Sequence, residues 1–122
     1  MRMWKTKAAT MKSKENTPKT LHLVLKSKWF DKIASGEKTS EYRVCSNYWN
    51  KRFCRNAPYF YCGANIIPTE KSECHLYSDV VFHRGYTNET MQFKIVSIKV
   101  LVNEPNDLGA AWCWEIKLGQ RM

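Results

Sequence analysis

The sequence lacks any long apolar run, because polar or charged residues interrupt its hydrophobic stretches throughout. No segment approaches the roughly 20 consecutive apolar residues that a membrane-spanning helix needs. The first residues include arginine and lysine, but the apolar core of a secretory signal peptide does not follow them. The sequence therefore predicts a soluble, cytoplasmic protein without a membrane partner, and its 122 residues suit one domain.

Paired metal-binding motifs are absent as well. The five cysteines, Cys45, Cys54, Cys62, Cys74 and Cys113, form no Cys-x-x-Cys pair of the kind that many zinc sites show. Their odd number favours reduced thiols, and a structural zinc held by the first four is the less favoured alternative. The chain also lacks a glycine-rich phosphate loop and a recognisable nucleophilic triad. We therefore expect no metal and no cofactor.

Acidic residues are scarce relative to basic ones, 11 against 20, so the formal net charge is +9. Residues 1–20 contain six basic side chains and a single acidic one, Glu15. No apolar periodicity runs through residues 1–19, where we expect a disordered basic arm, and we expect one folded domain over residues 20–122. The basic excess makes a nucleic-acid partner plausible without establishing it.

Hydrophobic alternation predicts several short strands. In residues 21–26 the three leucines share one parity, as in a strand with one buried face. Similar patterns cover residues 38–43, 79–83, 91–102 and 112–118, the last with Trp112, Trp114, Ile116 and Leu118 on its predicted buried face. Within residues 91–102 the apolar residues occupy odd-numbered positions up to Ile95 and mostly even-numbered positions after it. This switch in apolar parity indicates a bulge or a sharp bend.

Two short helices are predicted beside these strands. Phe30 and Ile33 lie on one helical face, with Ser27 as the expected N-cap and Gly36 as the residue of positive φ after the helix end. Residues 47–55 predict the second helix, and the chain from there to residue 75 shows no regular pattern. The whole pattern predicts a mainly β (α+β) fold, a small and mostly antiparallel β-barrel with one or two short helices.

The densest group of chemically active residues is the segment Gly36-Glu-Lys-Thr-Ser-Glu-Tyr-Arg43. In a strand, Glu41 and Arg43 share one face, so the carboxylate can orient the guanidinium, and Lys38 can reach the same space. A guanidinium held by a carboxylate suits a phosphate or the polar edge of a base. The alternative is an ordinary surface ion pair that contributes little energy.

Written as Gly-x-Lys-x-x-Glu-x-Arg, this segment resembles the signature of the ASCH family, which is related to the PUA fold. Residues 21–36 are similar to the strand and helix before the motif in compact bacterial and phage members. Arg84-Gly-Tyr86 resembles a second short block, and residues 114–119 resemble the closing strand, so the likeness covers about residues 20–119. It implies a PUA-like β-barrel with a cleft lined by the motif.

The resemblance also implies a function, the binding of RNA or nucleotides. The ligand-binding residues that we expect are Lys38, Glu41, Tyr42, Arg43, Arg84 and Tyr86. A few ASCH domains are hydrolases, and one branch removes the acetyl group of acetylcytidine with a Lys, a Thr three positions later and a distant Glu. Lys38 matches that Lys, Glu41 occupies the Thr position, and the distant Glu has no counterpart here.

Three hypotheses follow for the function. The leading one is a binder of RNA or of a nucleotide-like ligand, in which residues 48–55 either add aromatic and basic contacts or pack Trp49 and Phe53 against the barrel. The first alternative is a hydrolase of a modified nucleoside or of RNA, with Lys38 and Glu41 as its acid–base pair. The second alternative is a protein-interaction module. The oligomeric state stays open.

Overall fold

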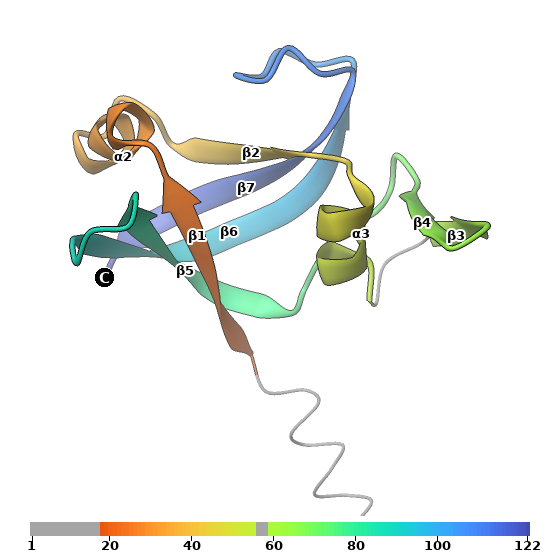
Figure 1. Cartoon of the computed structure of the whole chain (residues 1–122), viewed down its shortest axis with the longest axis horizontal. Coiled ribbons are helices and arrows are strands. Elements are labelled where there is room, and N and C mark those ends of the chain that lie inside the picture. The colour runs from red at the N-terminus through yellow and green to blue at the C-terminus, as the bar shows by residue number, and fades with distance from the viewer. Residues whose placement is uncertain (1–17, 56–58) are drawn as a thin grey trace, which may run out of the picture.

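The computed structural model describes residues 18–55 and 59–122. The arm predicted over residues 1–19 falls almost entirely outside the described residues, and the first strand begins at Lys19. Strands dominate the described chain and two short helices accompany them, which confirms the mainly β, α+β class (Figure 1). The elements are β1 (Lys19–Leu25), α2 (Ser27–Ala34), β2 (Ser40–Val44), α3 (Asn47–Phe53), β3 (Tyr59–Cys62), β4 (Asn65–Pro68), β5 (Tyr77–Arg84), β6 (Thr90–Val102) and β7 (Trp112–Arg121).

Among the described residues, five strands form one sheet in the order β1-β5-β6-β7-β2, and β3 and β4 form a separate hairpin. β1 runs parallel to β5, whereas the other three neighbouring pairs are antiparallel, which confirms the mostly antiparallel arrangement. The sheet curls into a half-barrel, as Figure 1 shows. β1 and β2 are its two edge strands and form no backbone ladder with each other in the described chain. We call the opening between them the seam.

The curl depends on β6, which is the longest strand. Its first part pairs with β5, most of it pairs with β7, and the register against β7 shifts at Phe93, Ile95 and Ser97. These irregularities confirm the bend that the switch in apolar parity predicted. Gly119 of β7 lies against this bend, since a Cβ atom there would stand 3.3 Å from Cγ2 of Val96. Glycine therefore lets the two strands approach closely.

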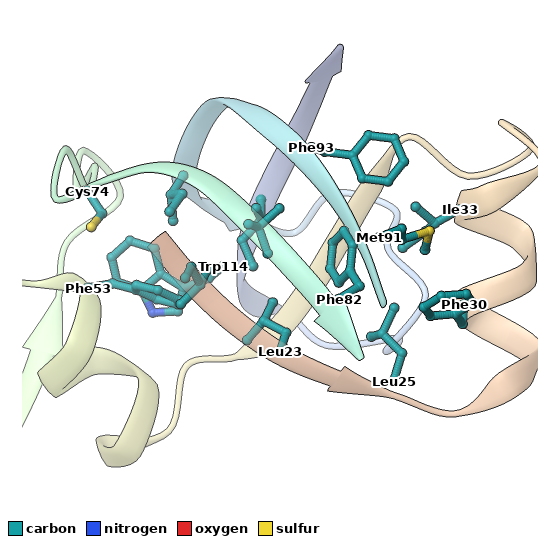
Figure 2. Close-up of a cluster of buried hydrophobic side chains, with 14 of the residues drawn as sticks. Leu23, Leu25, Phe30, Ile33, Phe53, Cys74, Phe82, Met91, Phe93 and Trp114 are labelled. Carbon is teal, nitrogen blue, oxygen red and sulfur yellow. The ribbon is translucent and has the colours of Figure 1, made fainter. Parts of the chain in front are cut away.

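The core fills the concave side of the sheet. The three alternating leucines of β1 are buried there, as predicted. Figure 2 shows Phe30 and Ile33 of α2 at one end of the core and Phe53 of α3 beside Trp114 at the other. The ring centroids of Phe53 and Trp114 are 5.1 Å apart. The two helices thus cover the two ends of the half-barrel.

Helix α2 buries its predicted face but begins differently. Ser27 is its first helical residue and not the N-cap, because the backbone N–H groups of Trp29 and Phe30 already donate to the carbonyl of Lys26. The side chain of Lys26 makes no capping hydrogen bond. Gly36 follows the helix with a φ of 83°, as expected. In the part of the chain that is described, no helix is long and apolar enough to cross a membrane.

The β3–β4 hairpin corrects the expectation of an irregular segment after α3. All four residues of β3 are exposed, so no hydrophobic alternation could indicate the strand. The hairpin lies beyond α3 in Figure 1 and is joined to it through Asn50. The amide of Asn50 donates to the carbonyl of Ile66 at 3.0 Å, and its oxygen accepts from the indole N–H of Trp114 at 2.9 Å. One buried side chain therefore links helix, hairpin and barrel.

Strand β7 departs from its predicted pattern at the first two residues. Trp114 and Ile116 are buried as expected, but Trp112 is 41% exposed and Cys113 is fully buried. Trp112 lines an apolar hollow beside the hairpin together with Phe60. The prediction for Trp112 was wrong because it followed the alternation of residues 112–118 alone. The hairpin beside Trp112 was not predicted.

We expect Asn50→Ala to lower the free energy of unfolding by about 2 kcal/mol, because the buried indole N–H of Trp114 and the carbonyl of Ile66 both lose their partner. Urea denaturation followed by circular dichroism measures the change. Lys51→Ala, at an exposed position of the same helix, is the matched control and should change the value by less than about 0.5 kcal/mol. If Asn50→Ala lowered the free energy of unfolding no more than Lys51→Ala does, the two hydrogen bonds of Asn50 would contribute little to stability.

Candidate functional site

The seam contains a pocket of about 390 Å³, which we call the seam pocket. The residues that line it include four of the motif, Lys38, Glu41, Tyr42 and Arg43, together with Trp29, Trp49 and Asp107 from elsewhere in the chain. A second hollow of about 300 Å³ adjoins it at Lys38. The open edge of the sheet and the predicted motif therefore coincide in space.

Strand β2 directs the charged side chains of the motif inward. In the antiparallel ladder with β7, Glu41 stands opposite Ile116 and Arg43 opposite Trp114. Residues directly opposite each other project from the same face of a sheet, and Ile116 and Trp114 belong to the core. Glu41 and Arg43 thus lie on the core-facing side of an edge strand. Because the sheet is open at the seam, both side chains line the pocket there.

Glu41 bridges the two cations of the motif. Its Oε1 lies 3.0 Å from Nζ of Lys38, and its Oε2 lies 2.9 Å from Nη2 of Arg43. Only 9% of the Glu41 side chain and 10% of the Lys38 side chain are exposed. Removing this carboxylate would leave Arg43 without a carboxylate partner among the described residues, in a largely buried site. The cluster is therefore more buried than the ordinary surface ion pair that was the alternative interpretation of the motif.

A second carboxylate reaches the cluster from a distant loop. Asp107 accepts a hydrogen bond from Nζ of Lys38. The neighbouring Asn106 organises this loop, since its side chain bonds two backbone carbonyls and two backbone N–H groups of residues 104–110. The sequence indicated a loop here but not the contact, because turn-forming residues reveal a turn and not what it touches. Asp107 is thus a site residue that the sequence did not identify.

Arg43 is held from several sides. Its Nη2 donates to the carbonyl of Val24 on β1 at 3.3 Å, in addition to its bond with Glu41. Its guanidinium lies over the ring of Trp49, 5.2 Å from the centroid. Nε is buried and has no hydrogen-bond partner among the described residues. Arg43 therefore crosses the seam from one edge strand to the other and does so at the wall of the pocket.

Aromatic rings border the charged cluster. The ammonium of Lys38 lies 4.7 Å from the ring centroid of Trp29 and 5.3 Å from that of Tyr42. Burial, followed by the negative charges of Glu115 and Asp107, raises the pKa of the Tyr42 phenol. The phenol stays neutral at physiological pH and donates to the Glu115 carboxylate at 3.4 Å. The pocket thus combines charged donors with flat apolar surfaces.

The structure does not bring Arg84 and Tyr86 into the seam pocket. The guanidinium of Arg84 pairs with Asp31 and with Glu89 and covers the ring of Phe30, 4.5 Å from its centroid. Tyr86 is fully exposed in the turn between β5 and β6. Arg84 therefore links α2 to this turn, and Tyr86 lines a separate hollow.

All five cysteines are free thiols. Burial, with a smaller contribution from neighbouring thiols, raises the pKa of Cys45 to about 12 and that of Cys54 to about 11. Cys62 lies exposed on β3. Within residues 18–55 and 59–122, no three His, Cys, Asp or Glu side chains are grouped as a metal site would require.

The fold and the pocket define a class, a small and open β-barrel-like α+β protein with an ion-pair cluster in its seam. In comparisons with known proteins, no family model, no curated protein and no solved structure matches this chain. Membership of the ASCH family accordingly stays a prediction from the sequence motif.

We expect Glu41→Gln to lower the free energy of unfolding by about 3 kcal/mol, because Arg43 loses its carboxylate partner in a largely buried site and Lys38 keeps only Asp107. Urea denaturation at neutral pH measures the loss. Glu104→Gln makes the same chemical change at an exposed loop position and should shift the value by less than about 0.5 kcal/mol. A Glu41 variant as stable as the wild type would contradict the role of the bridge.

A thiol-specific disulfide reagent at pH 8 should modify Cys62 rapidly and the other four cysteines slowly. The thiolate is the reactive form, and a raised pKa lowers the thiolate fraction of Cys45 and Cys54. Absorbance of the released chromophore measures both phases. Cys62→Ser should abolish the rapid phase, and denaturant should make all thiols reactive. Rapid reaction of several thiols in the folded protein would contradict their burial.

Proposed function

We propose that this protein binds RNA or a nucleotide-like ligand in the seam pocket. The observation that carries the proposal is the arrangement around Glu41, which holds the ammonium of Lys38 and the guanidinium of Arg43 side by side at the wall of one pocket. Both cations offer only hydrogen-bond donors, which suit phosphate oxygens and the carbonyl groups of bases.

Arg43 is the principal recognition residue in this proposal. Both of its hydrogen bonds use Nη2, so Nη1 has no partner among the described residues and is left to a ligand. Glu41, the Val24 carbonyl and the Trp49 ring orient the guanidinium before a ligand arrives. A group that is already ordered loses little conformational entropy on binding. Lys38 supplies a second donor, and Glu41 orients both.

The remaining walls support a base as the second part of the ligand. Trp29 borders the pocket, and aromatic side chains stack on unpaired bases. Trp49 forms another part of the wall, with its ring packed against Arg43 and stacked with Phe53. The pocket volume of about 390 Å³ lies in the range that small-ligand sites occupy.

The sequence motif adds independent support, because ASCH domains are thought to bind RNA or nucleotides. We accordingly propose that the chain is an ASCH domain with the PUA-like form of the β-barrel. Five free thiols fit the cytoplasmic location that we propose for it.

Arg43→Gln should weaken binding of a fluorescein-labelled, mixed-sequence, single-stranded octaribonucleotide by about tenfold or more, because hydrogen bonds to charged groups contribute about 1.5–3 kcal/mol. Fluorescence anisotropy at low and moderate salt measures the affinity. Lys94→Gln removes one positive charge from an exposed position of β6 outside the pocket. This control should change the affinity by less than about twofold.

If Arg43→Gln and Lys94→Gln weakened binding equally, the affinity would come from the overall positive charge and not from the pocket. That result would overturn the proposal. Circular dichroism confirms that each variant is folded, and Arg43→Lys, which keeps the charge but loses the fork of donors, should give an intermediate loss. RNA binding through phosphates should also weaken as salt rises, because counterions are released. Absence of RNA and nucleotide binding at low salt would favour the protein-interaction module.

One observation favours a second function, hydrolysis of a modified nucleoside such as acetylcytidine, or of RNA. The carboxylate of Asp107 contacts the Lys38 ammonium in the pocket. In amide hydrolysis Asp107 would take a proton from water, and the water oxygen would bond to the acetyl carbon. The bond from that carbon to the amide nitrogen would then break as Lys38 protonates the nitrogen, which releases cytidine and acetic acid. Glu41, with both oxygens paired, would orient Lys38.

Mass spectrometry of the protein incubated with acetylcytidine, and separately with RNA, tests this second function. A hydrolase should release cytidine and acetate or shortened RNA, and Lys38→Gln should lower the rate by orders of magnitude. Unchanged substrates would exclude it and leave the binding function untouched.

A further inference from the structure

A hollow of about 330 Å³ lies on the outer face of β1 and β5 and is lined in part by His22, His83 and Tyr86. We call it the outer shelf. Val24 lines both the outer shelf and the seam pocket. Its side chain points away from the core on β1 and is 47% exposed. The two hollows therefore meet at one exposed side chain at the edge of the sheet.

The outer shelf presents three rings. His22 and His83 come from neighbouring parallel strands, with ring nitrogens 3.1 Å apart and ring centroids 5.3 Å apart. Tyr86 is completely exposed, and the turn that carries it is tied to β1 because the N–H of Gly85 donates to the Leu25 carbonyl at 2.7 Å. Flat rings gathered at a surface suit base stacking, which tolerates any base.

Positive charge lies where the two hollows meet. The guanidinium of Arg43 donates to the carbonyl of Val24 itself, and Lys26, two residues further along, is exposed and lines the seam pocket. The residues that line the outer shelf include no carboxylate. A phosphate that passes Val24 would therefore meet two cations and no acidic group of the shelf.

We propose that the ligand is single-stranded RNA that occupies both hollows. One base enters the seam pocket, the next base stacks on the outer shelf, and the phosphate between them passes Val24 beside Arg43 and Lys26. A duplex cannot bind in this way, because a base inside a pocket must be unpaired. A free mononucleotide would leave the outer shelf unused. This inference rests on the proposed function of the seam pocket and names its substrate class.

Tyr86→Ala in the full chain tests the inference. The probe is the labelled octaribonucleotide, and each of the four nucleoside 5′-monophosphates is titrated separately as a competitor. Loss of one stacking ring should weaken octaribonucleotide binding about tenfold, within the range measured for base–aromatic stacking. The inhibition constants of the mononucleotides should stay within about twofold, because the seam pocket is intact.

Tyr61→Ala is the matched control, since Tyr61 is an exposed tyrosine of β3 that lines neither hollow. It should leave both affinities unchanged. If Tyr86→Ala behaves like this control, or weakens mononucleotides and octaribonucleotide equally, the two-hollow inference is overturned. In that case Arg43→Gln still weakens both ligands if the proposed function holds. If Arg43→Gln weakens neither ligand, the proposed function itself fails.

Discussion

A carboxylate that is withdrawn from water needs cationic partners, and Glu41 meets this requirement with Lys38 on one oxygen and Arg43 on the other. Each cation is then held by a further contact, Lys38 by Asp107 and Arg43 by the carbonyl of Val24. The positions of the β6–β7 loop and of the edge of β1 relative to β2 are therefore linked to this single side chain.

The sheet topology explains why such a cluster stands at this place. β1 pairs only with β5 and β2 only with β7 in the described sheet, so two edge strands border the seam without a ladder between them. Exposed strand edges promote aggregation, and inward-pointing charges on an edge strand counteract it. The charges of β2 thus protect an edge and, in the function proposed here, also recognise a ligand. A closed barrel would have neither the pocket nor the need for the charges.

Prediction from the sequence succeeded where a residue's role depends on its near neighbours in the chain. The alternation of β1, the parity switch in β6 and the turn at Gly36 are local patterns, and the structure confirms all three. The pairing of Glu41 with Arg43 is local as well, because residues two apart in a strand share a face. The β3–β4 hairpin was missed because its strand β3 has no buried face and therefore no alternation.

The sequence by itself determined the class of fold, the inner face of β1 and of β7 from Trp114 onward, and the charged motif at β2, because these follow from periodicity and from spacings of a few residues. Only the tertiary structure decided that Asp107 joins Lys38, that Arg43 crosses to Val24, and that two hollows meet at one side chain. These contacts connect segments distant in the chain. Their geometry depends on how far the sheet curls and where it stays open, which local patterns do not specify.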